Sequence, residues 1–266
     1  MSIQIFMKSL LFISIIYTTL FNSHQVTGLK WGATGHRVIG KLASNMISKH
    51  TASKINELLD GVSLAQISTF ADEIKSDKRY RKYNAWHYAN INDDETYVKS
   101  KKNEKGDIVK AINTCIDVLK SSTSERSKKQ FYLKLLVHFV GDVHQPMHLA
   151  RYSDRGGNNI KIKWFGDNSN LHRVWDSNMI DQYGMSYTEI TQNLPKLKTS
   201  EISEIANTPL ITWVNESQDL AKHIYKTLPE NINLDYLYQY DHFNTVRMQL
   251  LKGGIRLAAL LDEIFK

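Results

Sequence analysis

The chain has 266 residues, 42% of them hydrophobic, which is enough for one sizeable hydrophobic core. Its formal charge of +7 favours polyanionic partners such as nucleic acids or acidic lipids, although a generic solubilising surface accounts for the charge equally well. The single cysteine, Cys115, excludes an internal disulfide, so stability has to come from packing and from any metal that the chain binds.

The beginning of the chain has the build of a secretory signal peptide. Lys8 precedes a largely apolar run, Leu10–Phe21, which is too short to span a bilayer comfortably. Cleavage most simply follows Gly28, because small residues suit signal peptidase. No later segment is a long uncharged apolar run, so we expect a secreted or periplasmic protein without stable membrane association.

Hydrophobic periodicity predicts a mainly α fold, a single-domain multi-helix bundle without repeats or an obvious interdomain linker. The predicted helices are Thr34 to about Lys49, Ala52–Leu59, Ser63–Ile74, Asp107–Leu119, a central helix between Glu125 and Gln145, Glu201–Thr227 and Leu234–Phe265. Pro209 and the pair Gly253-Gly254 are the expected kinks in the last two helices.

One stretch carries the only persuasive strand signal. A turn, S-D-R-G-G-N-N at 153–159, precedes the alternating apolar residues Ile160, Ile162 and Trp164. This pattern predicts a short β-hairpin near 159–165.

The central helix carries ionisable groups that an ordinary apolar core would reject. His138 and Asp142 lie one turn apart and share a face, so an imidazole and a carboxylate can reach the same cation. Pro146 is expected to end the helix and to let His148 turn back toward that face. His144 projects about 240° from His138 and is interpreted as an outer-face residue. The alternative is a bundle core whose histidines bond to backbone carbonyls.

Further nitrogen and carboxylate ligands occur elsewhere in the chain. His172 and Asp176 repeat the four-residue spacing, although taken alone they fit a surface pair equally well. His36 lies in a predicted first turn, Asp72 on the third predicted helix, and His87 in the aromatic segment W-H-Y-A-N. A ligand set of histidines and carboxylates suits zinc, and these residues are too many for one tetrahedral ion. Two or three close metal ions indicate in-line displacement at phosphorus.

Competing metal motifs are absent from the sequence. The chain has no H-E-x-x-H protease motif, no His-Asp dipeptide typical of another phosphohydrolase class, and no cysteine pair for a zinc finger.

These motifs together resemble the S1/P1 nucleases, zinc-dependent enzymes whose mainly helical fold is shared with bacterial phospholipase C. The segments that carry the resemblance are W-G-A-T-G-H at Trp31, F-A-D at Phe70, W-H-Y-A-N at Trp86, H-F-V-G-D-V-H-Q-P-M-H at His138, D-R-G-G-N at Asp154 and N-L-H-R-V-W-D at Asn170. They cover essentially the whole mature chain, which implies a nuclease domain over residues 31–266 after a signal peptide of residues 1–30. Because fungal and plant members carry disulfides, the lone Cys115 leads us to expect a cysteine-poor bacterial type.

The resemblance implies a particular distribution of ligands over three zinc ions. The first ion would take Asp72, His87, His138 and Asp142, the second would take His148, His172 and Asp176, and the third would take Trp31, His36 and the bridging Asp142. In the family the amino-terminal Trp supplies its free amine and its carbonyl. Cleavage would then follow residue 30, or a second protease would trim the product of cleavage after residue 28.

The resemblance also implies the reaction: hydrolysis of single-stranded DNA and RNA to 5′-phosphate products, with release of 3′-phosphate from nucleotides. Asp72 would help to hold the attacking water, and Lys75, one turn on, could stabilise the phosphorane charge; an ordinary surface lysine is as good an interpretation. Tyr88 and Asn90 match positions that stack on and hydrogen-bond to a base, although Tyr88 could equally be a core aromatic.

Two alternative functions also fit the sequence. Whichever function holds, we expect the protein to be monomeric. The first is a zinc phospholipase C that uses the same metal cage on lipid head groups, and the base-binding pair Tyr88 and Asn90 argues against it. The second is a non-catalytic helical protein that binds zinc or polyanions, which would need no open coordination position. Phosphodiester turnover distinguishes this second alternative from a nuclease.

Overall fold

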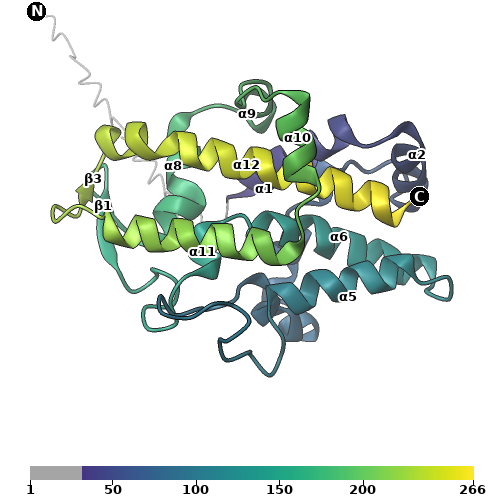
Figure 1. Ribbon diagram of the computed structural model, residues 1–266, viewed down its shortest axis with the longest axis horizontal. Helices are drawn as coiled ribbons and strands as arrows, with labels where there is room; N and C mark the ends of the chain where they lie inside the picture. The colour runs from purple at the N-terminus through teal and green to yellow at the C-terminus, as the bar shows by residue number, and fades with distance from the viewer. Residues whose placement is uncertain (1–31) are drawn as a thin grey trace, which may run out of the picture.

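Helices make up most of the secondary structure in residues 32–266, the part of the chain that the computed structural model describes (Figure 1). The α-helices are α1 (Ala33–Met46), α2 (Lys49–Leu58), α3 (Leu64–Ile67), α4 (Phe70–Glu73), α5 (Ile108–Lys120), α6 (Arg126–Asp142), α7 (Leu171–Arg173), α8 (Met179–Tyr183), α9 (Tyr187–Gln192), α10 (Thr199–Ala206), α11 (Leu210–Lys226) and α12 (Tyr236–Ile264). The 3-10 helices are η1 (Ile74–Ser76), η2 (Lys78–His87) and η3 (Pro146–Leu149), and η4 (Val174–Asn178) is a π-helical turn. The prediction of a mainly α fold is confirmed, while the predicted signal peptide and Trp31 lie outside the described residues.

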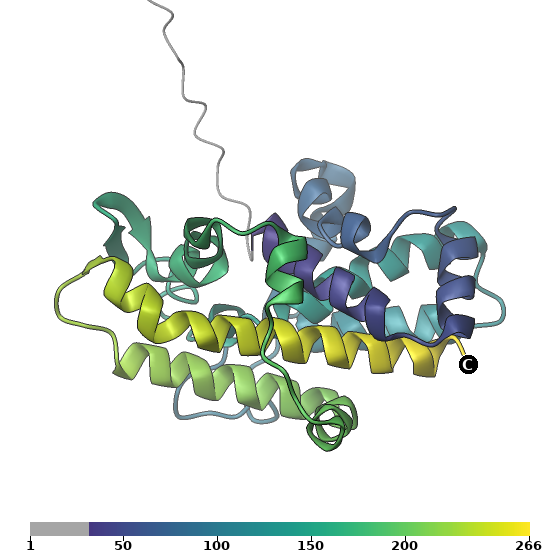
Figure 2. The same cartoon turned by 90° about the horizontal axis from the view of Figure 1, so that it is seen from above.

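Helix α12 runs along the molecule and packs against α1 (Figures 1 and 2). Two glycines on α12 allow this close approach: a Cβ added at Gly254 would lie 2.4 Å from Leu42 Cδ2, and one at Gly253 would lie 3.0 Å from Ile39 Cδ1. The kink that we predicted at these glycines is wrong, because α12 continues through them. Their role is to remove side-chain bulk at a helix crossing.

The C-terminal half of helix α6 is deeply buried, and α5 packs along the helix. Its last turns are buried on every face, from Leu135 through Asp142, so the helix lacks the polar stripe of a surface helix. The helix ends at Asp142, four residues before Pro146, which instead opens η3. The prediction that Pro146 ends the helix is therefore wrong, although His148 does follow it in the 3-10 turn.

Two long predicted helices are divided in the structure. The segment Glu201–Thr227 becomes α10 and α11, because Pro209 occupies the residue before α11 and cannot donate a backbone hydrogen bond to a preceding turn. Similarly, Ser63–Ile74 becomes α3, α4 and the start of η1. Asp72 consequently lies on the four-residue helix α4, which contacts α6.

A three-stranded sheet lies at one end of the molecule (Figure 1). Strand β1 (Lys161–Trp164) pairs antiparallel with β2 (Asp167–Asn170), and the two residues between them, Phe165 and Gly166, have φ values of 51° and 85°. Two consecutive positive φ angles are typical of a tight hairpin turn. The predicted hairpin is confirmed, and a parallel strand that we did not predict, β3 (Asn233–Leu234), pairs with the other edge of β1.

Among the helices of residues 32–266, none combines the length and the apolar character that crossing a membrane requires.

Candidate metal centre

The centre of the site is the last turn of α6. Asp142 Oδ2 lies 3.2 Å from His138 Nε2, one turn earlier on the helix, and 2.8 Å from His87 Nδ1 at the end of η2. All three side chains are buried. The face that the helical spacing predicted for His138 and Asp142 therefore exists, and it points at an imidazole from a separate segment.

Helix α4 adds a second carboxylate to this face. Asp72 Oδ1 lies 3.6 Å from His138 Nε2 and 3.8 Å from His87 Nδ1. Together, Asp72, His87 and His138 offer one ligand atom each, all within 4.8 Å of one another, so they can hold a metal ion. The other nitrogen of His138, Nδ1, donates to the carbonyl of Ser68 at 2.7 Å, which leaves the Nε2 lone pair facing the carboxylates.

The first turn of α1 brings in His36. Its Nε2 lies 3.5 Å from Asp142 Oδ1, and its ring stacks on that of His138 with centroids 3.8 Å apart. The close approach depends on Gly141, where an added Cβ would lie 2.5 Å from His36 Nδ1. His36, His138 and Asp142 form a second group whose ligand atoms fit one cation.

A third group comprises His148, His172 and Asp176. His148 Nε2 lies 3.5 Å from Asp176 Oδ1, while His148 Nδ1 donates to the carbonyl of His87 at 2.8 Å. The imidazole of His148 is thus oriented through Nδ1 and faces the group with Nε2, as is usual for metal-binding histidines. The prediction that four-residue spacing places His172 and Asp176 together is confirmed, and the surface-pair alternative is wrong because both are buried.

The glycine-rich turn at 153–159 holds His172 in place. His172 Nδ1 donates to the carbonyl of Gly156 at 2.8 Å. Gly156 has a φ of +63°, and a Cβ there would lie 2.5 Å from the carbonyl oxygen of Met147. Only glycine fits this conformation and this space, so the turn needs Gly156 in order to reach His172.

The electrostatics at His87 and Asp142 favour the protonation states that metal binding needs. Burial, together with the nearby Lys75 ammonium, lowers the pKa of His87 to about 3, so this imidazole is neutral at neutral pH. Burial alone would raise the pKa of Asp142, but His138 and His148 hold it well below its usual range. Neutral imidazoles such as that of His87 and ionised carboxylates are the forms that bind metal ions. At His138 the effect of burial is outweighed by Asp142 and Asp72, which raise its pKa, so a bound cation would replace a proton on this imidazole.

Several buried atoms in the site have no hydrogen-bond partner among the described residues. They are Nδ1 and Nε2 of His36, Nε2 of His87, Oδ1 of Asp142 and Nε2 of His148. Leaving a buried polar atom unsatisfied costs about 1–3 kcal/mol, so five in one place require an explanation. Cations coordinated by these nitrogen and oxygen atoms would supply it, and the residues therefore fit metal ions at more than one group of ligands.

The remaining predicted site residues surround the cluster. Lys75 donates to Asp72 Oδ1, and its side chain is only 22% exposed, so it is not an ordinary surface lysine. Tyr88 and Asn90 line a cavity of 430 Å³ that also contains His87 and His148. Tyr88 is half-buried, which excludes its interpretation as a core aromatic.

His144 does not belong to any of the three groups, as predicted, but its assignment to an outer face is wrong. The side chain is fully buried, because α6 has already ended at Asp142 and the following turn directs His144 toward α12. A helical angle calculated for residues beyond the helix end has no meaning.

Sequence reasoning missed Gln145, which is buried beside the third group. Its Nε2 donates to Asp176 Oδ1 at 3.1 Å, and its Oε1 accepts from the backbone N–H of Met147. This amide therefore fixes both a carboxylate of the site and the turn that carries His148. The signal available was a polar residue between two candidate ligands in an otherwise apolar segment.

The chain is similar to known nucleases over almost its whole length. The family model described as S1/P1 Nuclease matches residues 31–266. Endonuclease 2 of Arabidopsis thaliana is 31% identical over 264 residues, which cover 88% of this chain and 90% of that protein. Nuclease S1 of Aspergillus oryzae is 27% identical, covering 88% of this chain and 91% of that protein. Nuclease P1 of Penicillium citrinum is also 27% identical, covering 88% and 97%.

Proposed function

The chain belongs to the S1/P1 nuclease family and is a hydrolase of phosphodiester bonds, and from this premise we propose how its site acts and on what. Its substrates are single-stranded DNA and RNA, which it cleaves to 5′-phosphate products, and nucleotides, from which it releases 3′-phosphate. The observation that supports this best is the set of buried, unpartnered ligand atoms beside a cavity lined by Tyr88 and Asn90.

We assign three zinc ions to the three groups of ligands. The first takes Asp72, His87 and His138 together with Asp142, and the second takes His148, His172 and Asp176. The third takes His36 and Asp142 together with Trp31, which lies outside the described residues. A set of nitrogen and carboxylate ligands without thiolate suits zinc. Bound there, the ions would supply Lewis acidity to the phosphate and lower the pKa of water for in-line displacement.

The protein's own groups orient and stabilise the reacting phosphate. Asp72, held by Lys75, positions the attacking water, and the Lys75 ammonium offsets charge that develops on the phosphate oxygens. Tyr88 stacks on the base and Asn90 hydrogen-bonds to its edge, which requires an unpaired base. Duplex DNA, whose bases are stacked and paired, should therefore be a poor substrate.

The amino terminus of the chain bears on both export and activity. We propose that residues 1–30 are a signal peptide, and the family match, which begins at Trp31, supports this boundary. The enzyme would then be secreted or periplasmic, and it would act as a monomer. A version beginning at Trp31 should bind more zinc and be more active than one beginning at Leu29, since an acylated nitrogen has no available lone pair. Equal activity and zinc content in both would remove Trp31 from the ligand set.

Elemental analysis and a substrate panel test the proposal directly. Purified mature enzyme should contain about three zinc ions per chain. It should cleave single-stranded DNA and RNA, release phosphate from 3′-nucleotides, and leave phospholipid vesicles intact. Turnover of phospholipid without turnover of nucleic acid would replace the proposed substrate with a lipid head group, and absence of any turnover by the zinc-loaded chain would refute an enzymatic role.

A further inference from the structure

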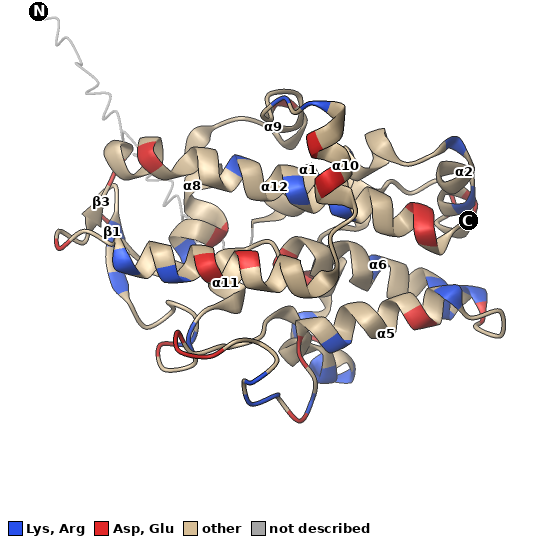
Figure 3. Ribbon diagram, in the orientation of Figure 1, with Lys and Arg blue, Asp and Glu red and all other residues tan. Residues whose placement is uncertain are grey.

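A second cavity adjoins the metal centre, and apart from Tyr88 and Asn90 its lining residues have no role in the proposed reaction. Its volume is 480 Å³, larger than that of the cavity at the metal centre. The two cavities share Tyr88, Asn90 and Tyr152, so these three residues stand between them. The rest of the lining comes largely from the segment between η2 and α5, at the lower edge of the molecule in Figure 3.

The wall of this cavity is fixed by hydrogen bonds. Trp86 Nε1 donates to the carbonyl of Lys105 at 3.0 Å, and the hydroxyl of Tyr97 donates to the carboxylate of Asp107 at 3.1 Å. The Lys102 ammonium donates to the carbonyls of Tyr97 and Ser100, and it lies over the Tyr97 ring. The cavity is therefore held open before any ligand arrives, which lowers the entropy that binding costs.

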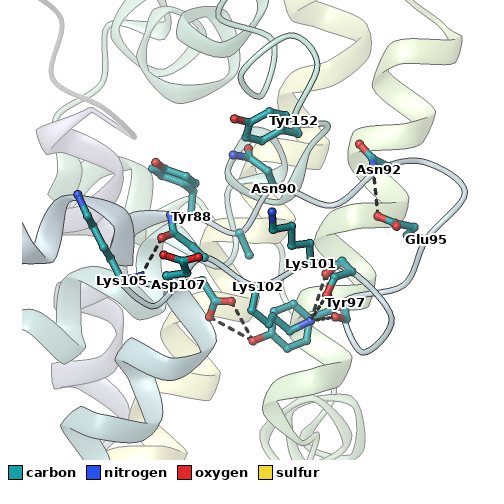
Figure 4. Close-up of a pocket in the computed structure, with 14 residues that line it drawn as sticks. Tyr88, Asn90, Asn92, Glu95, Tyr97, Lys101, Lys102, Lys105, Asp107 and Tyr152 are labelled. Atoms are coloured by element: carbon teal, nitrogen blue, oxygen red, sulfur yellow. Dashed lines mark hydrogen bonds between the residues drawn. The ribbon is translucent and has the colours of Figure 1, made fainter.

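Two lysines of the lining remain available to a ligand. Lys101 and Lys105 are exposed, and their ammonium groups form no hydrogen bond or ion pair within residues 32–266. Lys101 points toward Asn90 and Tyr152, and Lys105 extends past Tyr88 (Figure 4). The two cations thus lie on different sides of Tyr88, one of the residues that the two cavities share (Figure 4).

The carboxylates of the lining are mostly occupied by the protein itself. Asp107 accepts from Tyr97 and caps α5 through the N–H groups of Val109 and Lys110, and Glu95 accepts from Asn92 Nδ2 at 3.2 Å. These neutral donors orient the two carboxylates without removing their charge, and neither carboxylate forms an ion pair with Lys101 or Lys105 within residues 32–266. Only Glu104 is an exposed carboxylate without such a contact in the described part of the lining.

The lining combines free cations, an exposed aromatic ring and side-chain amides, which is the combination that binds single-stranded nucleic acid. Tyr152 is 74% exposed at the junction and offers a stacking surface, and Asn92 and Asn103 add hydrogen-bonding groups. We propose that this cavity binds the neighbouring nucleotide of a single strand whose scissile phosphate lies at the metal centre. Lys101 and Lys105, which lie on different sides of Tyr88 (Figure 4), pair with separate phosphates of the strand, and Tyr152 stacks on a base between the two cavities. This inference rests on the proposed nuclease function, and it adds a preference for polynucleotides over mononucleotides.

The test compares two double variants that remove the same charge. Lys101→Ala/Lys105→Ala acts on the cavity, whereas Lys49→Ala/Lys54→Ala acts on exposed residues of α2, which does not line it. Binding of a fluorescent phosphorothioate oligothymidylate by the zinc-loaded protein is followed by anisotropy at several salt concentrations. The cavity variant should bind about tenfold more weakly, and its salt slope should fall by about 0.7 for each lysine that no longer pairs with a phosphate, while the control variant stays within about twofold of wild type. Lys101→Arg should retain binding, because it keeps the charge.

A mononucleotide assay separates this site from the metal centre. The KM and kcat for release of 3′-phosphate from a mononucleotide should be unchanged in the cavity variant, while the KM for an oligonucleotide rises. Equal oligonucleotide binding by both double variants, or an equal loss on mononucleotide and oligonucleotide, would overturn the inference while leaving the nuclease function intact. Wild-type protein that binds the oligonucleotide through Lys101 and Lys105 but cleaves no phosphodiester would refute the proposed function alone.

Discussion

Two buried polar clusters flank the C-terminal end of α6. They differ in whether protein groups satisfy the hydrogen bonds of their buried polar atoms. The first, the metal-facing cluster, consists of His36, His87, His138, Asp142 and His148, and it contains buried atoms without hydrogen-bond partners among the described residues. The second, the arginine cluster, consists of His144, Arg256, Glu216 and Thr208. In it every buried side-chain nitrogen and oxygen of the described residues has a partner.

The arginine cluster is closed by protein groups alone. Arg256 donates from Nη1 to His144 Nε2, from Nε to Thr208 Oγ1 and from Nη2 to Glu216 Oε1, each at 3.0 Å. His144 Nδ1 in turn donates to the carbonyl of Val140 at 2.7 Å. Burial and the adjacent Arg256 charge lower the pKa of His144 to about 3, so its Nε2 accepts a hydrogen bond as a neutral imidazole.

Residue type alone does not identify a metal site, since both clusters pair histidine with a carboxylate and a buried charge. What separates them is satisfaction of hydrogen bonds. Where a protein cation such as Arg256 completes the network, the cluster stabilises the fold, and where donor atoms converge without protein partners, a metal ion completes it. Metal removal and substitutions in each cluster should therefore have different effects, which are given below from the largest to the smallest.

Removal of metal should affect the metal-facing cluster most. Chelation should abolish activity and lower the melting temperature, because each ion present at about 1,000 times its dissociation constant contributes about 4 kcal/mol to folding. Differential scanning calorimetry before and after chelation measures this, and added zinc should restore both activity and melting temperature. A melting temperature that is insensitive to chelation would mean that the unpartnered atoms do not bind ions.

Asp142→Asn tests the bridging carboxylate. The amide keeps the shape but removes the charge that lies between His36, His138 and His148, so activity should fall about 10³-fold while helicity measured by circular dichroism stays near wild type. Asp117→Asn, an exposed change on α5, is the matched control. A loss below about tenfold would be incompatible with a shared ligand at Asp142.

Arg256→Met tests the arginine cluster. It removes the buried cation and leaves Glu216 and His144 without their donor, so the free energy of unfolding should fall by about 2–3 kcal/mol, less than for a fully buried pair because Glu216 is partly exposed. Metal content should stay at the wild-type value. Arg37→Met on the exposed face of α1 serves as control in urea unfolding. Loss of metal from the folded variant would show that the two clusters are one unit.

The smallest effect is expected from two buried glutamines, one beside each cluster. Gln145→Leu removes the hydrogen bond to Asp176 and should weaken metal affinity by about 10–100-fold. Gln249→Leu removes the hydrogen bond to the carbonyl of His144 and should lower stability by about 1–2 kcal/mol without changing metal affinity. Competition with a chromophoric chelator distinguishes the two outcomes, and identical affinities would remove Gln145 from the support of the site.

Local rules were enough to predict much of the site. The helical period places His138 and Asp142 on one face whatever the rest of the chain does, and the same spacing brings His172 and Asp176 together. Hydrophobic periodicity likewise predicted most helices, and the alternation of Ile162 and Trp164 predicted the hairpin. These features depend on residues a few positions apart, so the sequence by itself determines them.

Contacts between segments that are distant in the sequence decided the features of the site and the fold that local patterns did not predict. His144 meets Arg256 from 112 residues away, and α6 ends at Asp142 rather than at Pro146 because the turn after it is held by Ser217 and Gln249 from α11 and α12. No local period encodes such partners. Likewise Gly253 and Gly254 suggest a kink in isolation but are spacers against α1, since the cost of a Cβ depends on the neighbour that it would meet.

The sequence alone thus determined which residues can coordinate metal, because ligand chemistry and helical spacing are local properties. Only the tertiary structure decided which of them face a common point without other partners, and that His144, of the same residue type, is satisfied by Arg256 instead. It also placed Lys101 and Lys105 in the lining of a cavity that adjoins the metal centre, through a loop that carries no periodic signal. The physical reason is that hydrogen-bond satisfaction and cavity shape are sums over neighbours from the whole chain, which no short window contains.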